Sequence, residues 1–158
     1  MIGGMGGNGS YSKIFRGVPD ASRTHIDTHM RIDGHKVLLQ SGNVGQSKNI
    51  MNSNSGGPIY ITAKVKEDGT MIVHSVNVFK DHKISLEINF KYDTKGNMIP
   101  YSRNSNKGSH AHKWYVNDRG EFQRRRHDAR NVFEIPSEYE ELVRHIDEFN
   151  KKKRKWEK

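Results

Sequence analysis

Three segments in the middle of the chain alternate apolar and polar residues, and turn residues separate them. They are Ile59–Val65, Met71–Phe79 and Ile84–Tyr92. Because successive side chains of a strand point to opposite faces, this pattern predicts an antiparallel meander with one buried face. We expect the apolar side chains of the first and third segments to line the core: Ile59, Ile61, Ala63, Val65, Ile84, Leu86, Ile88 and Phe90.

Apolar residues at helical spacing occur both before and after this meander in the sequence. Ile26 and Met30 have that spacing, and Asp20 or Ser22 could cap a short helix within residues 20–35. Near the end, Ser137 and Glu140 have capping-box spacing beside an apolar stripe of Tyr139, Leu142, Val143, Ile146 and Phe149. Lys36–Gln40 and Met98–Tyr101 are predicted as further strands.

The predicted fold class is therefore α+β. We expect a central antiparallel β-meander, a basic C-terminal hairpin, a short N-terminal helix and a C-terminal amphipathic helix. A chain of 158 residues has the length of one domain, which we place at residues 13–150. A flexible Gly-rich arm at residues 1–12 precedes it, a basic tail at 151–158 follows it, and residues 41–57 are predicted to be a long loop.

Composition restricts the chemistry. The chain has 0 cysteines, which excludes disulfides, thiolate nucleophiles and Cys-ligated zinc. Only 32% of the residues are hydrophobic, which predicts a small core. Since no apolar run of about 18 residues and no signal-peptide pattern occurs, we expect a cytoplasmic protein without a membrane partner.

Positive charge is concentrated in two blocks. The net charge is +9, and residues 102–130 carry 8 Lys and Arg against 3 acidic residues. Residues 151–158 carry 6 against 1, whereas residues 131–150 hold 1 Arg and 6 acidic residues. Focused positive potential of this kind favours a polyanion, most simply a nucleic acid.

The first basic block also contains three histidines. The segment Ser109–Trp114 is followed, across a predicted turn at Asn117–Gly120, by Arg124–Asp128. With an even-length loop, Val116 would pair with Glu121. In that register Trp114 faces Gln123, His112 faces Arg125 and His110 faces His127, all on one side of the hairpin.

Cleavage of RNA without a metal is one use of this cluster. His110, His112 and His127 are the candidate catalytic residues, since two imidazoles could act as base and acid while a 2′-hydroxyl attacks the adjacent phosphate. The candidate phosphate-binding residues are Lys113, Arg124, Arg125 and Arg126. Trp114 and Tyr115 are the candidate residues for stacking on bases.

Other uses of the same residues remain open. No cofactor is favoured, but a divalent metal could be held by His110, His112, His127 and Asp128, or by His25 and His29 at helical i, i+4 spacing. The nearby arginines oppose a metal because cations repel each other. The cluster could also bind nucleic acid without catalysis, or be an exposed basic hairpin whose histidines form only local hydrogen bonds.

Several stretches resemble small uncharacterised proteins of bacterial phages and mobile genetic elements. They are Met1–Gly7, Arg23–His29, Asn49–Ser55 and the His110-Ala111-His112 segment. The resemblance implies roles that such elements need, such as a toxin nuclease or an inhibitor of a host nucleoprotein complex, and it assigns no site residue.

The expected function is nucleic-acid binding directed at phosphates, with RNA as the favoured partner and metal-independent ribonuclease activity as its enzymatic form. One alternative is a noncatalytic phage or mobile-element interaction protein that inhibits a host nucleoprotein complex. A further alternative is a His-ligated, metal-dependent nuclease.

Overall fold

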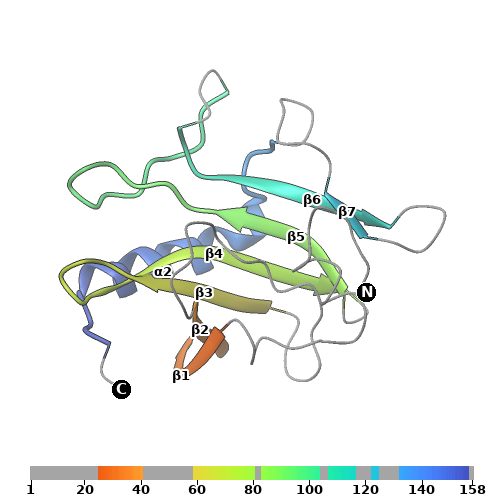
Figure 1. Ribbon diagram of the computed structural model, residues 1–158. Coiled ribbons are helices and arrows are strands. Elements are labelled where there is room, and N and C mark those ends of the chain that lie inside the picture. The colour runs from red at the N-terminus through yellow and green to blue at the C-terminus, as the bar shows by residue number, and fades with distance from the viewer. Residues whose placement is uncertain are drawn as a thin grey trace.

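The computed structural model describes residues 25–40, 59–80, 83–103, 107–116, 122–124 and 132–156. They form one sheet and one α-helix (Figure 1). The strands are β1 (His25–Ile32), β2 (His35–Gln40), β3 (Ile59–Val65), β4 (Met71–Lys80), β5 (Lys83–Asn89), β6 (His110–Val116) and β7 (Phe122–Arg124). A 3-10 turn, η3 (Ser137–Tyr139), leads into the helix α2 (Glu140–Lys151).

The strands lie in the sheet in their chain order, from β1 to β7. The antiparallel meander predicted for β3, β4 and β5 is confirmed, and β6 and β7 continue it. β1 and β2 are also antiparallel, whereas β2 and β3 pair in parallel. The sheet is therefore mixed, and the α+β class is confirmed. The predicted arm at 1–12 and loop at 41–57 lie outside the described residues.

Helix α2 covers one face of this sheet (Figure 1). Its buried residues Leu142, Ile146 and Phe149 pack against alternate strand residues: Val37, Leu39, Ile61, Ala63, Met71, Val73, Val76, Ile88, Phe90 and Ala111. Most of the predicted core residues lie here. Val65 does not, because it ends β3 and is 44% exposed. Ile84 is buried outside this cluster, since the β4–β5 register shifts between Val78 and Phe79.

The predicted N-terminal helix is wrong over the described residues from His25 onward. That segment forms β1, which turns at Asp33-Gly34 and pairs with β2. Both turn residues have positive φ, 52° and 81°, as a two-residue hairpin turn requires. The Asp33-Gly34 pair was thus the sequence pattern that indicated a β-hairpin here. The spacing of Ile26 and Met30 misled because β1 contains an irregularity between Asp27 and Arg31.

The predicted C-terminal helix is confirmed, but its start differs from the capping box. Tyr139 rather than Ser137 is the N-cap of α2, and no side chain in the described part of the chain caps it. Ser137 instead begins the short 3-10 turn. The predicted strand Met98–Tyr101 is reduced to a single bridge between Tyr92 and Met98.

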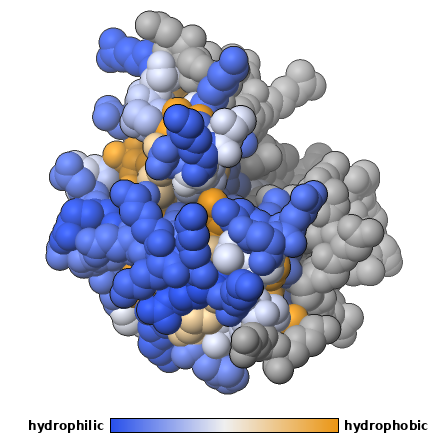
Figure 2. Space-filling model, turned by 90° about the vertical axis from the view of Figure 1, so that its left-hand side faces the viewer, coloured by the Kyte–Doolittle hydropathy of each residue, from blue (hydrophilic) through white to orange (hydrophobic). Residues whose placement is uncertain are grey.

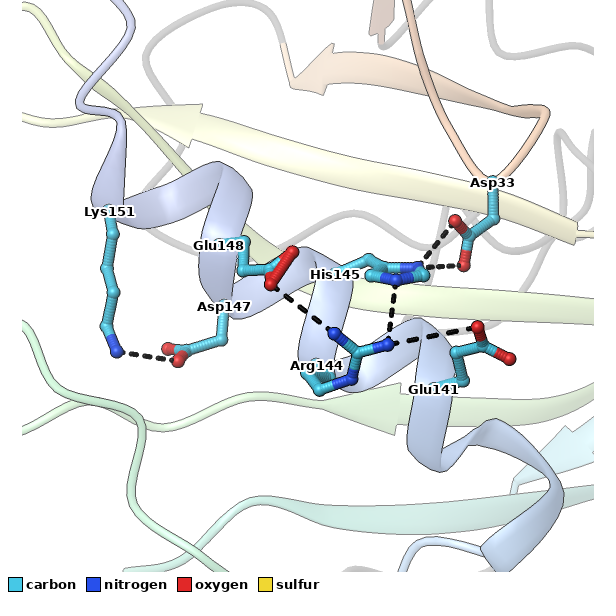
Figure 3. Close-up of polar contacts among 7 residues, drawn as sticks. All are labelled: Asp33, Glu141, Arg144, His145, Asp147, Glu148 and Lys151. Carbon is cyan, nitrogen blue, oxygen red and sulfur yellow. Dashed lines mark hydrogen bonds and ion pairs between the residues drawn. The ribbon is translucent and has the colours of Figure 1, made fainter.

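Polar contacts fix α2 to the β1–β2 turn (Figure 3). His145 Nδ1 lies 2.6 Å and 2.8 Å from the two carboxylate oxygens of Asp33. Arg144 extends a hydrogen bond of 3.1 Å to Nε2 of the same ring. Since a guanidinium can only donate, His145 Nε2 accepts and Nδ1 donates to Asp33.

The residues after α2 return to the sheet. Met71 N–H donates to the Arg154 carbonyl, and Trp156 N–H donates to the Gly69 carbonyl. Trp156 packs against the core, while the lysines and Arg154 of residues 151–155 are exposed. This end of the molecule is largely hydrophilic (Figure 2). In the described part of the chain, no helix combines the length and apolar character needed to cross a membrane.

Candidate functional site: a buried polar face of the sheet

The face of the sheet that α2 does not cover carries polar side chains. In β3 to β6 they alternate with the core residues and form two rows across the strands. The first row is Tyr60, Asn77, Glu87 and His112, and the second is Thr62, Ser75, Asn89 and His110. Directly opposed residues of this kind have Cβ atoms about 5 Å apart. We call these eight residues the polar face.

Most of the polar face is buried. His110 is 2% exposed and His112 is 0% exposed, and Glu87, Asn77, Thr62 and Ser75 are equally inaccessible. Burial of polar groups is costly unless partners compensate for the lost water. The Thr62 and Ser75 hydroxyls compensate each other through a short hydrogen bond. A concentration of buried ionisable and amide groups is characteristic of functional sites.

His110 and His112 form a direct contact. Their Nε2 atoms are 3.0 Å apart, and the rings meet nearly at right angles. His110 Nδ1 is also 2.9 Å from the carbonyl oxygen of Gly108. Because a carbonyl can only accept, this nitrogen carries a proton, and Nε2 of the neutral ring then has a lone pair. His112 Nε2 is therefore the donor, and one proton lies between the two rings.

The preceding loop orients His110. A Cβ added to Gly108 would lie 2.0 Å from the Pro100 carbonyl oxygen, so no other residue fits there without displacing backbone. Ser109 N–H donates to the Ile99 carbonyl, and Ser109 Oγ accepts from Lys91 N–H. These contacts hold the carbonyl that sets the tautomer of His110.

Glu87 lies beside the histidine pair. It is directly opposite His112 across β5 and β6, and its Oε1 accepts a hydrogen bond of 3.1 Å from the Trp114 indole N–H. A carboxylate in this position stabilises positive charge on a neighbouring imidazole. Sequence reasoning missed Glu87. The alternation of β5 placed it opposite the core, where a solvated side chain was expected.

Asn77 was missed for the same reason. It is 0% exposed, and within the described residues neither its Oδ1 nor its Nδ2 has a hydrogen-bond partner. Leaving a buried donor or acceptor unsatisfied costs about 1–3 kcal/mol. Its row neighbour Tyr60 contacts Phe79 edge to face, with ring centroids 5.4 Å apart. An unsatisfied amide thus lies next to an aromatic pair.

The predicted hairpin register is wrong by one residue. Val116 pairs with Phe122, Tyr115 with Gln123 and Trp114 with Arg124, which leaves residues 117–121 between the strands. The same edge of β6 pairs with Phe133 at Ala111, and the expected opposition of His110 and His127 is a prediction that falls outside the described residues.

The other predicted site residues are distributed as follows. Lys113 is on the opposite side of β6 from the histidine pair, and its ammonium lies 4.5 Å from the centroid of the Phe133 ring. Trp114 shares the face of the pair. Tyr115 and Arg124 lie in strands, but their side chains are outside the described part. Arg125, Arg126, His127 and Asp128 also lie outside it.

The structure separates the other predicted metal pair. His25 is 4% exposed, and burial lowers its pKa to about 4, whereas His29 is exposed on β1. Within the described residues, no group of three or more His, Asp or Glu side chains could hold a metal ion. β1 is five strands from β6, or about 24 Å, so His25 and the histidine pair do not converge.

A hollow of about 480 Å³ lies elsewhere, between α2 and the chain that leads into β6. Met98, Ile99 and Val143 contribute apolar surface, and Glu140, Arg144 and Asp147 contribute charge. It does not include the histidine pair. The histidine pair and the hollow therefore lie in different parts of the fold.

Comparisons of this chain with family models, with curated proteins and with solved structures found no match. The site is therefore interpreted from its own geometry.

Proposed function

We propose that this protein is an RNA-binding, metal-independent ribonuclease in which His110 and His112 are the acid–base pair. The observation that carries this proposal is the 3.0 Å contact between their Nε2 atoms on a buried polar face. One nitrogen holds the shared proton and the other has a lone pair. The pair therefore presents an acid and a base side by side, which is what transfer of a phosphoryl group between two hydroxyl oxygens needs.

The reaction is attack of a ribose 2′-oxygen on the adjacent phosphorus. The lone pair of one imidazole accepts the 2′-hydroxyl proton while the new P–O bond forms. The bond from phosphorus to the 5′-oxygen breaks, and His112 Nε2 donates its proton to that oxygen as the proton taken up by His110 Nε2 passes to His112. The products are a 2′,3′-cyclic phosphate and a 5′-hydroxyl, and the pair has exchanged one proton for another. Because the lone pair is on His110 Nε2, the imidazolium forms on His110 when that ring accepts the 2′-hydroxyl proton.

Charge supports an RNA substrate in this proposal. Residues 102–130 contain the histidine pair and carry 8 Lys and Arg against 3 acidic residues. In this proposal the cations of this segment neutralise the phosphates of a bound strand and the charge that develops on the reacting phosphate. An RNA substrate also agrees with the expected cytoplasmic location.

The test is cleavage of single-stranded RNA in the presence of EDTA, with the product ends identified. Wild-type protein should release 2′,3′-cyclic phosphates, and His110→Gln and His112→Gln should each reduce the rate by at least about 100-fold. His35→Gln is the matched control because His35 begins β2, four strands from β6. Intact RNA with the wild-type protein, or cleavage abolished by EDTA, contradicts the proposal. RNA that is bound but never cut would instead favour the noncatalytic interaction protein.

A further inference from the structure

We propose that Asn77 is the base-recognition residue of this site and that its amide pairs with the hydrogen-bonding edge of one nucleobase of the RNA. The inference rests on the proposed function and specifies which part of the substrate the polar face binds.

The side-chain amide of Asn77 is buried without a partner among the described residues. Asn77 is 0% exposed in the middle of the sheet. Native proteins satisfy nearly all such groups, and the exceptions occur where a ligand or water completes them. An Asn side chain offers one acceptor beside one donor, and the matching ligand has one donor beside one acceptor.

A buried aromatic pair lies next to this amide, with Tyr60 8% and Phe79 6% exposed. Tyr60 is opposite Asn77 on β3, and Phe79 follows two residues later on β4. The two rings contact each other edge to face. A nucleobase fits both features, because its edge carries adjacent donors and acceptors and its flat face packs on aromatic rings. Water or a lone phosphate would use the amide but not the rings.

Asn77 lies two strands away from the histidine pair. Asn77, Glu87 and His112 lie in one row on adjacent strands. Two strand spacings amount to about 10 Å. This separation is comparable with the span from the edge of a nucleobase to the phosphate on the same ribose. A base at Asn77 would therefore bring its own phosphate toward His110 and His112.

The test compares Asn77→Leu with Asn150→Leu in the full chain. Asn150 is the matched control because both of its amide atoms are bonded, to Val73 N–H and to the Tyr92 hydroxyl. Binding of the four nucleoside 3′-monophosphates is measured by calorimetry, and the unfolding midpoint is measured without nucleotide. Removing an unsatisfied amide should raise the midpoint by about 2–4 °C, whereas removing a satisfied one should lower it.

For nucleotide binding we expect the Asn77 substitution to be harmful and the Asn150 substitution to be neutral. Asn77→Leu should weaken binding of the preferred nucleotide by about tenfold or more, and Asn150→Leu should leave it unchanged. If Asn77→Leu does not fold, Asn77→Val makes the same comparison. The inference is overturned if the wild-type protein binds none of the nucleotides. It is also overturned if the Asn77 variant keeps the wild-type affinity, as it would where only a buried water meets the amide. A loss of stability in the Asn77 variant like that of the Asn150 variant overturns it as well.

The two proposals fail separately. Nucleotide binding that depends on Asn77, together with RNA left intact, would retain the base site and reject the ribonuclease. RNA cleavage that depends on the histidines, together with nucleotide binding unaffected by Asn77→Leu, would retain the ribonuclease and reject the base site.

Discussion

The side-chain amide of Asn150 on α2 closes a ring of hydrogen bonds with Tyr92, which follows β5. Asn150 Nδ2 donates to the Tyr92 hydroxyl at 2.8 Å, and that hydroxyl donates to the Val73 carbonyl at 2.5 Å. Val73 N–H in turn donates to Asn150 Oδ1 at 2.9 Å. Three groups that burial would otherwise leave unsatisfied are thus paired, and α2 is fixed to the sheet on the side opposite the polar face.

Asn150→Leu should reduce the free energy of unfolding by about 2–3 kcal/mol, since it removes partners of both Val73 N–H and the Tyr92 hydroxyl. Tyr92→Phe removes one hydroxyl and should cost about 1 kcal/mol. Urea unfolding followed by circular dichroism measures both values. An Asn150 variant as stable as wild type would show that the ring does not contribute to stability.

Stability should also fall in mild acid. Burial lowers the pKa of His25 from 6.5 to about 4, and burial, aided by Lys64 and His25, lowers that of His74 to about 3. Below pH 6.5 the unfolded chain therefore binds protons that the folded protein excludes. The stabilising effect is complete above that pH and is lost as the pH falls toward the folded values. Each histidine contributes at most about 1.4 kcal/mol per pH unit.

Unfolding in urea at pH 7, 6 and 5 tests this prediction, because carboxylates titrate mainly below that range. His74→Gln should make the dependence on pH shallower than in the wild type. The same slope in both proteins would mean that His74 is protonated in the folded state.

The meander and α2 could be predicted because their signals are local. Alternation in Ile59–Val65 and the apolar stripe from Tyr139 to Phe149 each fix one element without reference to the rest of the chain. The parallel pairing of β2 with β3 has no such signal, since it joins segments that a long connection separates. The β1 strand was missed because the Asp33-Gly34 turn was not weighed against two apolar residues at helical spacing.

The site was predicted only in part, for a related reason. His110 and His112 are two residues apart on one strand, so their shared face follows from the sequence. Asn77 and Glu87 look like ordinary solvent-facing residues of a half-buried sheet. Only the pairing of β4 with β5 and of β5 with β6 places them beside the histidines. The hairpin register failed because loop length was inferred from the turn residues alone, and one residue of shift changes every opposing partner.

Gly108→Ala should destabilise the fold by about 1–3 kcal/mol, because the added methyl group must displace the Pro100 carbonyl. It should also disturb the hydrogen bond from His110 Nδ1 to the Gly108 carbonyl. Nitrogen-15 NMR of the imidazole rings reports this directly, since protonated and unprotonated ring nitrogens differ widely in chemical shift. Gly96→Ala is a useful comparison, because nothing lies within 4 Å of its added Cβ and its cost comes from a φ of 86° alone. Unchanged His110 signals in the Gly108 variant would contradict the orienting role of this loop.

The contact between His145 and Asp33 should couple α2 to the β1–β2 turn by about 0.5–1 kcal/mol. Both side chains are partly exposed, which weakens the interaction. A double-mutant cycle with Asp33→Asn and His145→Gln measures this coupling. The pair of Lys151 and Asp147 on the same helix provides the comparison, since its atoms are 3.0 Å apart, the Lys151 side chain is 68% exposed and neither residue pairs with His145 within the described residues. We expect less coupling there, about 0.3–0.5 kcal/mol. Equal values for the two cycles would mean that the link from α2 to the turn adds no more to stability than a surface pair within one helix.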